Sequence, residues 1–303
     1  MSVHSRRDLF SAGLRTSVAA GAAAILSPDC GAVEPPTRIA GSRLKVGSCA
    51  YSYRQLLQSK TAPMSLFQFL ERCAELNMDG VELTSYYFQE PITLAQIHKV
   101  SQRAFLLGLE VAGTAVGNVF CLPVGEARTT NIVKVKQWID YARDMGAPCL
   151  RVFAGDPPKG LEPAIGRKWV VECLEECLPH AEERGVTLAL ENHHGVVADA
   201  EGVIEILNAV KSDWFGMKWD SGNFNTSDPY TDLAKTAKYA VTTHIKTEVA
   251  PNGKKQPSDL AKIVGMLRNA SYRGYLMLEY EGAEPPLTAI PKAILELQSL
   301  SAK

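Results

Sequence analysis

The sequence predicts a closed (β/α)8 barrel, the TIM-barrel fold, as a single domain. Strand-like and helix-like segments alternate regularly, and eight such units in about 260 residues match the usual size of that barrel. Several strands, such as VTLALE and YLMLE, are almost continuously apolar, as in a parallel sheet covered on both faces. A doubly wound open sheet is the alternative, but Gly47-Ser48-Cys49 after the first strand is no glycine-rich phosphate fingerprint.

The individual elements follow from the periodicity of the apolar residues. Strands are expected at 44–52, 80–88, 110–117, 149–155, 186–194, 215–224, 240–249 and 273–282. Apolar residues recur at three- and four-residue spacing between them, which predicts helices that include 65–77, 126–145, 165–184 and 287–299. Gly146 and Gly185 lie where two of these helices should end. Pro179 is expected to kink or break the helix at 165–184.

Residues 1–35 are predicted to be a twin-arginine-type signal peptide, with the barrel expected at 43–303. The segment SRRDLF (5–10) precedes a weakly apolar run that Arg15 interrupts and that is too short to span a bilayer. This pattern implies passage through the twin-arginine translocase to the periplasm or another exported location. The alternatives are a disordered tail, and a lipoprotein modified at Cys30, which the preceding Pro-Asp disfavours.

Composition excludes some partners. The chain has 32 basic and 33 acidic residues, which argues against a nucleic acid or a membrane surface beyond the export signal. Seven cysteines are spread without a CxxC pair, so buried reduced thiols are expected rather than a disulfide framework. Five of them fall in or beside predicted strands or on a predicted helix: Cys49, Cys121, Cys149, Cys173 and Cys177.

Four consecutive strands each end in a potential metal ligand, namely Glu191, Asp220, His244 and Glu279. Neighbouring strands lie about 4.8 Å apart, so these side chains can converge near the barrel axis. Three carboxylates and one imidazole favour a hard divalent cation, Mn2+ first, with Mg2+, Co2+ or Zn2+ as alternatives. Any one of the four alone would more often be a cap or an ion-pair residue. Lys218 could pair with Asp220, and Arg273 or Lys292 with Glu279.

Six motifs carry a family resemblance over residues 44–300: DGVEL (79–83), LRVFAG (150–155), LENHHG (190–195), WDSGNF (219–224), THIKTE (243–248) and LMLEYEG (276–282). In this order they resemble the xylose-isomerase-like (β/α)8 superfamily, and within it the sugar phosphate isomerase/epimerase group. The resemblance implies one divalent cation held by Glu191, Asp220, His244 and Glu279.

The chain departs from two branches of that superfamily. The endonuclease branch carries additional histidines where this chain has Asn223 and Thr242, and the chain lacks a basic face. The ketose 3-epimerases usually carry a Glu and an Arg where this chain has Val197 and Ala250. The resemblance therefore does not extend to a particular substrate.

The predicted reaction is isomerisation or epimerisation of a sugar or keto-sugar through an enediolate. The cation would polarise the substrate carbonyl, while Glu191 and Glu279 would move the proton. Six residues are predicted to contact the substrate: Glu82, Asn118, Arg151, His193, Asn223 and Lys246. For Arg151 and Lys246 the alternative is neutralisation of the acidic ring, for Glu82 an interior ion pair, and for His193 a solvent-facing loop.

Two other classes of function stay open. A metal-dependent lyase or dehydratase would use the same base on a keto-sugar or a 3-oxo-glycoside and then expel a leaving group. A non-catalytic sugar-binding protein would bind its ligand without a metal. A homo-oligomer is compatible with either class.

Overall fold

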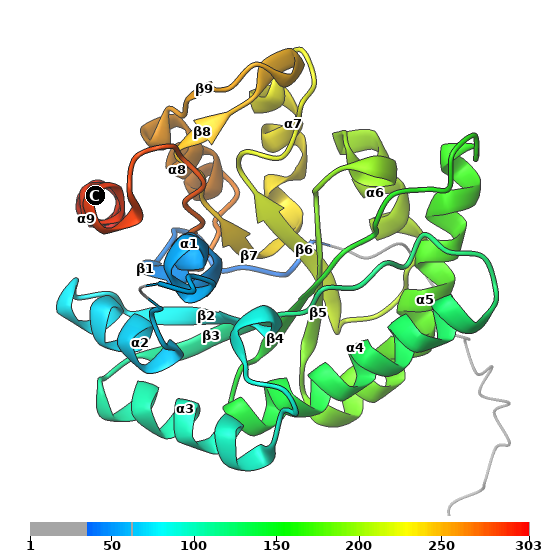
Figure 1. Ribbon diagram of the computed structural model, residues 1–303. Helices are drawn as coiled ribbons and strands as arrows, with labels where there is room; N and C mark the ends of the chain where they lie inside the picture. Colours follow the sequence, from blue (N-terminus) through cyan, green and yellow to red (C-terminus); the bar gives the residue numbers. More distant parts are fainter. Residues whose placement is uncertain (1–34, 62, 303) are drawn as a thin grey trace, which may run out of the picture. The chain divides into compact units, whose positions relative to one another are not determined.

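The computed structural model describes residues 35–302, except residue 62. Eight parallel strands form one sheet in the order β10-β1-β2-β3-β4-β5-β6-β7, which confirms the predicted (β/α)8 barrel (Figure 1). The eight strands are β1 (Leu44–Cys49), β2 (Gly80–Thr84), β3 (Glu110–Ala115), β4 (Cys149–Val152), β5 (Thr187–Glu191), β6 (Phe215–Asp220), β7 (Ala240–His244) and β10 (Gly274–Leu278).

The barrel closes between β7 and β10 through a short seam. Ile245 and Leu278 form an isolated parallel bridge there. The amide of Ile245 donates to the Met277 carbonyl at 2.8 Å, and the amide of Glu279 donates to the Ile245 carbonyl at 2.9 Å. The seam thus begins directly after His244 and ends at Glu279.

Helices cover the outside of the barrel. They are α1 (Arg54–Leu57), α2 (Leu66–Glu75), α3 (Leu94–Leu106), α4 (Glu126–Met145), α5 (Pro163–Arg184), α6 (Ala200–Ala209), α7 (Pro229–Thr236), α8 (Leu260–Asn269) and α9 (Pro286–Ser301). Capping boxes at Ser65 and Thr93 start α2 and α3. The predicted glycine ends are confirmed, because Gly146 and Gly185 adopt left-handed backbone conformations after α4 and α5.

Two predictions about the strands are wrong, and the prediction about Pro179 is wrong in part. Helix α5 continues through Pro179 to Arg184, so the proline does not break it. The barrel strands end earlier than predicted, because the chain turns into short 3-10 segments at Ala50–Tyr53 and Ser85–Tyr87. The predicted strand 240–249 ends at His244, and its last residues instead form a small antiparallel hairpin of β8 (Glu248–Val249) and β9 (Gln256–Pro257).

Strand β6 shows how alternation along a strand separates the outer core from the barrel interior. Trp219 is fully buried, and its indole N–H donates to the Leu233 carbonyl of α7 at 3.1 Å, so this side chain faces the helices. Lys218 and Asp220, on either side of it, are also fully buried but contact polar groups inside the barrel. The interior near the strand ends is therefore polar, and the apolar core lies between sheet and helices.

The described cysteines agree with the expectation of reduced thiols, since all six are free and buried.

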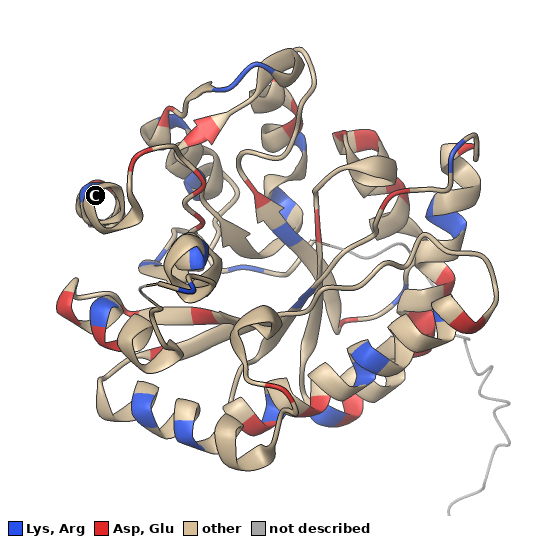
Figure 2. Cartoon of the chain, in the orientation of Figure 1, with Lys and Arg blue, Asp and Glu red and all other residues tan. Residues whose placement is uncertain are grey.

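Acidic and basic residues lie side by side on α4 and α5 (Figure 2). No described helix is both long and apolar enough to cross a membrane. The predicted signal peptide lies outside the described residues apart from Pro35, so it stays a prediction.

A hollow of about 570 Å³ opens at the N-terminal end of the barrel strands, where Glu110, Thr187 and Gly274 line it with apolar neighbours. This end of a (β/α)8 barrel usually serves stability, whereas catalytic residues gather at the C-terminal end. The ligand candidates lie at that C-terminal end.

Candidate metal centre

The last four barrel strands bring four ionisable side chains together. Glu191, Asp220 and His244 are the final residues of β5, β6 and β7, and Glu279 directly follows β10. One ligand atom from each of the four lies within 4.8 Å of those from the other three, and all four residues are buried. The structure therefore places the four predicted metal ligands around one point at the barrel mouth.

The imidazole of His244 lies among the three carboxylates. Its Nδ1 is 3.5 Å from Glu279 Oε1, 3.6 Å from Glu191 Oε2 and 3.8 Å from Asp220 Oδ2. These distances are too long for hydrogen bonds. Atoms that share one cation at about 2.1 Å each lie about 3.0–3.4 Å apart, so the observed spacing is close to that of a coordination shell.

Three of these atoms lack a hydrogen bond to any described residue, although Glu191 Oε2 forms an ion pair with Arg151. Among the described residues, His244 Nδ1, Glu191 Oε2 and Asp220 Oδ2 are buried without a hydrogen-bond partner. Buried polar atoms without partners are uncommon in proteins and require an explanation. A divalent cation among them would satisfy all three at once, so the residues present fit such a group.

The charges around this point lead to the same conclusion. With every carboxylate ionised and His244 neutral, as a bound cation would require, five carboxylates face three permanent cations, which leaves two negative charges for a divalent cation to balance. The carboxylates belong to Glu82, Glu191, Asp220, Glu279 and Glu281, and the cations to Arg151, Lys218 and Lys246.

Without a cation, the three ligand carboxylates do not ionise alike. Burial, followed by the negative charges of Glu191 and Glu279, outweighs Lys246 and raises the pKa of Asp220 to about 8. Although burial opposes it, Arg151 and His244 lower the pKa of Glu191. His244 and Lys246 likewise overcome burial and lower the pKa of Glu279. Burial, with the crowding of like charges added to it, favours the protonated form of Asp220 at neutral pH.

Glu82 fixes the ring of His244 from behind. His244 Nε2 lies 2.7 Å from Glu82 Oε1, and the ammonium of Lys218 pairs with Glu82 Oε2. Although burial opposes it, Lys218 and His244 lower the pKa of Glu82 to about 2, so this carboxylate can only accept. The proton of that hydrogen bond must be on Nε2, which turns Nδ1 toward the ligand cluster. Glu82 is thus both an interior ion-pair residue and the positioning partner of His244.

Replacing Glu82 by Gln is expected to lower the free energy of unfolding by about 3–5 kcal/mol, because Lys218 would stay buried without its counter-charge. Lys218 is fully buried and Glu82 is 2% exposed. Urea unfolding measures the loss. The double variant Glu82→Gln/Lys218→Met is the matched control and should recover most of the stability, since it removes both charges. A single variant within 1 kcal/mol of the parent, on the scale of an exposed pair, would contradict the prediction.

Arg151 and Lys246 neutralise the acidic ring. Arg151 Nε is 3.1 Å from Glu191 Oε2, and the Arg151 side chain is 5% exposed. Lys246 Nζ is 3.1 Å from Glu279 Oε2 and 3.6 Å from Asp220 Oδ2, and it also pairs with Glu281. These ion pairs agree with neutralisation of the acidic ring, which was the predicted alternative to substrate contact for both residues.

The two predicted asparagines differ in position. Asn223 donates to Glu191 Oε1 at 3.0 Å and accepts from Lys246 Nζ at 3.0 Å, so it links these two residues of the cluster. Asn118 forms two hydrogen bonds of 2.9 Å with the backbone of Phe153, one as donor and one as acceptor. Its side chain holds the loop after β4 and does not join the cluster.

His193 and His194 lie on the loop after β5. The half-buried ring of His193 packs 4.7 Å from Phe153 and 4.0 Å from His194, measured between ring centroids. Burial, despite the nearby Glu191, lowers the pKa of His193 to about 4, so its imidazole is neutral near pH 7. His194 is exposed and pairs with Asp156 at 2.5 Å. His193 is therefore the one of the two that borders the cluster.

A small cavity adjoins the cluster. It has a volume of about 190 Å³, and Asn223, Lys246 and Glu281 form its wall toward the metal ligands. Asn225 and the hairpin residue Glu248 line it farther out. Its lining combines charged side chains of both signs with apolar surface.

Sequence reasoning missed several contributors to the centre. Asn192 exchanges two hydrogen bonds with the Asp220 backbone, at 2.8 and 2.9 Å, and thereby ties β5 to β6 beneath the ligands. Lys218 was considered only as an alternative partner of Asp220, but it pairs with Glu82. Strand alternation could have indicated its inward direction, because Lys218 is two residues before Asp220. Cys49 was considered only as a buried thiol, yet it borders Glu279.

Fold and site together define a (β/α)8 barrel with one candidate metal centre at its C-terminal mouth. The family model of the xylose isomerase-like TIM barrel matches residues 70–300, and the chain belongs to that family. No curated protein matches the chain by sequence.

Solved structures share the fold at low sequence identity. A 3-keto-D-glucoside 4-epimerase from E. coli is 16% identical with a TM-score of 0.68, covering 85% of this chain and 100% of that one. A D-psicose 3-epimerase from Clostridium cellulolyticum H10 is 15% identical with a TM-score of 0.68, covering 86% and 99%. A mannonate dehydratase from Streptococcus suis serotype 2 is 16% identical with a TM-score of 0.63, covering 86% and 94%.

Proposed function

We propose that the protein is a divalent-metal-dependent isomerase or epimerase that acts on a sugar or keto-sugar through an enediolate. The observation that carries this proposal is the buried cluster of Glu191, Asp220, His244 and Glu279, with three orphaned ligand atoms facing one point. Mn2+ is the cation we propose, because three carboxylates and one imidazole form a hard ligand set. When bound, the cation would stabilise negative charge that develops on the substrate carbonyl oxygen.

Glu191 and Glu279 are the proposed proton-transfer pair. Their strands, β5 and β10, are separated by β6 and β7, so the two carboxylates approach the centre from different directions. The pKa of each is lowered, so both are ionised at neutral pH and able to accept a proton. One would remove the proton beside the carbonyl and later release it to water, and the other, after taking a proton from water, would deliver it to the same or a neighbouring carbon.

Neighbouring residues would hold the two carboxylates in a fixed orientation. Asn223 donates to Glu191 Oε1, which leaves Oε2 directed at the cluster. Lys246 lies 3.1 Å from Glu279 Oε2, which leaves Oε1 directed at His244. The cavity beside Asn223 and Lys246 would accept the hydroxyl-bearing part of the substrate. His193 would border the substrate as a neutral hydrogen-bonding ring.

A lyase or dehydratase is the second candidate. The same cluster would remove the proton, and a group on the next carbon would then leave. A mannonate dehydratase is among the proteins that share this fold, which favours keeping this class. Val197 and Ala250, in place of the Glu and Arg usual in ketose 3-epimerases, also favour a substrate other than a simple ketose.

Solvent-deuterium exchange tests the proposal and separates the candidates. The protein with Mn2+ would be incubated in D2O with unphosphorylated ketoses and with 3-oxo-glycosides, and products followed by NMR and mass spectrometry. Incorporation of deuterium with no released group is expected for the isomerase. Release of water or of an aglycone would instead identify the protein as a lyase or dehydratase. Tight sugar binding without exchange, insensitive to a chelator, would overturn both in favour of a sugar-binding protein.

A further inference from the structure

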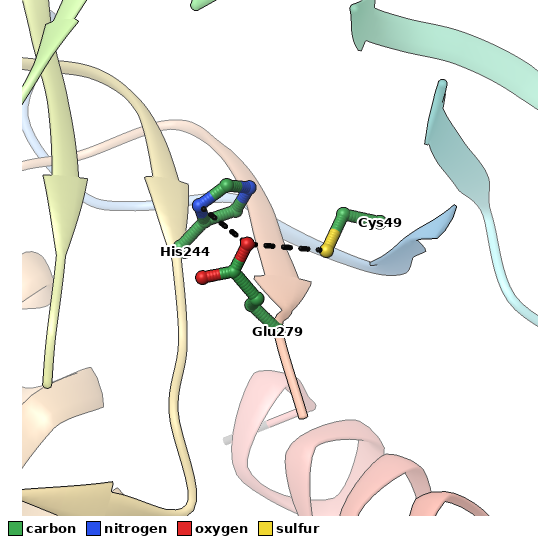
Figure 3. Close-up of side chains that lie close together, drawn as sticks. All are labelled: Cys49, His244 and Glu279. Carbon is green, nitrogen blue, oxygen red and sulfur yellow. Dashed lines mark hydrogen bonds and ion pairs between the residues drawn. The ribbon is translucent and has the colours of Figure 1, made fainter. Parts of the chain in front are cut away.

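A thiol lies on the edge of the metal-ligand cluster. Cys49, the last residue of β1, is fully buried, and its Sγ is 3.7 Å from Glu279 Oε1. Figure 3 shows Cys49, His244 and Glu279 directed toward one another from β1, β7 and the end of β10. One ligand atom from each lies within 4.8 Å of those from the other two.

His244 provides an independent indication of a ligand at this place. Its Nδ1 is buried, has no hydrogen-bond partner among the described residues, and is 3.5 Å from the same Glu279 oxygen that Cys49 approaches. The residue itself is 1% exposed, so no bulk water reaches that nitrogen. The orphaned nitrogen thus faces Cys49 and Glu279 as well as the carboxylates of the hard ligand set.

We propose that Cys49, His244 and Glu279 form a second, softer ligand set for thiophilic cations such as Zn2+ and Cd2+. Thiolate ligands select soft cations, whereas Glu191 and Asp220 suit harder ones such as Mn2+. A thiolate, an imidazole and a carboxylate are three ligands that zinc commonly accepts, with a fourth position left for water. The inference rests on the proposed metal centre but concerns which cations the centre takes.

The two ligand sets exclude each other. Both need His244 Nδ1, which has a single lone pair, so the centre holds one cation at a time. A soft cation would bind Cys49 as the thiolate, and the thiol proton would be released to solvent. The thiolate of Cys49 would also draw the cation toward β1 and away from Glu191 and Asp220. Soft cations are therefore expected to displace Mn2+ and to slow turnover.

Titration of the metal-free full-length protein with Cd2+ tests the proposal. Near-ultraviolet absorption from sulfur-to-cadmium charge transfer is expected to rise to a plateau at one equivalent. Cys49→Ala should abolish that absorption and weaken Cd2+ binding by at least about tenfold, while Mn2+ affinity changes by about twofold or less. Cys49→Ser serves as a second variant, because a hydroxyl fills part of the same space without the soft sulfur.

Other cysteines supply the controls. Cys177, buried on the outer helix α5, and Cys30, outside the described residues, should each be replaceable by Ala without loss of the absorption. Absorption that persists in Cys49→Ala would overturn the second ligand set. Cd2+ binding to the parent protein that produces no such absorption would overturn it as well. Mn2+ binding that survives while the cadmium signal fails would leave the proposed function standing. Failure to bind either cation would remove the metal centre itself.

Discussion

The variants Glu279→Gln and Glu191→Gln are each expected to lower kcat/KM by about 10²–10⁴-fold, the usual contribution of one proton-transferring side chain. An amide has nearly the shape of the carboxylate but cannot accept a proton from carbon. Each change also removes one negative charge from the ligand cluster and weakens cation binding. Deuterium exchange into the substrate, measured with saturating Mn2+, separates the lost proton transfer from the lost cation.

Glu284→Gln is the matched control for this pair. Glu284 lies five residues after Glu279 and pairs with Lys292 at 2.7 Å on the surface. An exposed pair of this kind contributes about 0–1 kcal/mol, so activity and stability should stay near those of the parent. Circular dichroism and thermal melting would show that all three variants fold. Exchange at the parental rate in Glu279→Gln and Glu191→Gln would eliminate both as the bases.

Removal of divalent cations is expected to reduce turnover to background, and Mn2+ is expected to restore it. The cation should also stabilise the fold, because its ligands come from four strands and are buried. At a cation concentration about 100 times Kd the gain is about 2.7 kcal/mol, which corresponds to a rise in Tm of about 5 °C or more. Calorimetry with and without chelator measures it.

The variant His244→Ala provides the control for that experiment. It removes the nitrogen that both ligand sets share, so Mn2+ should no longer raise its Tm. A chelator that leaves turnover and Tm of the parent unchanged would contradict a role for metal in either catalysis or stability.

The fold was predictable because helical and strand periodicities alternate with little ambiguity, and because the alternative, a doubly wound open sheet, lacked its glycine-rich phosphate turn after the first strand. The ends of the strands were less predictable. Residues 50–53 and 85–87 are as apolar or aromatic as the strands before them, so hydropathy alone does not show where pairing stops. Pro179 does not break α5, because buried residues continue on both sides of it, from Cys177 and Leu178 to Ala181.

The cluster was predictable for a different reason. Parallel strands that close into a barrel place their last residues at one height, so four polar ends in succession imply one shared point. The partners behind the cluster depend on pairing across the barrel, which the order of the chain does not reveal. Lys218 on β6 meets Glu82 on β2, 136 positions earlier in the sequence. Cys49 approaches Glu279 because β1 is hydrogen-bonded to β10, the last strand.

The short seam between β7 and β10 gives a cation at the centre a structural role. His244 ends the strand on one side of this seam, and Glu279 follows the strand on the other. An ion held by both would link the last two strands of the barrel across this seam. Occupancy of the barrel mouth would then also strengthen the weakest join in the barrel wall.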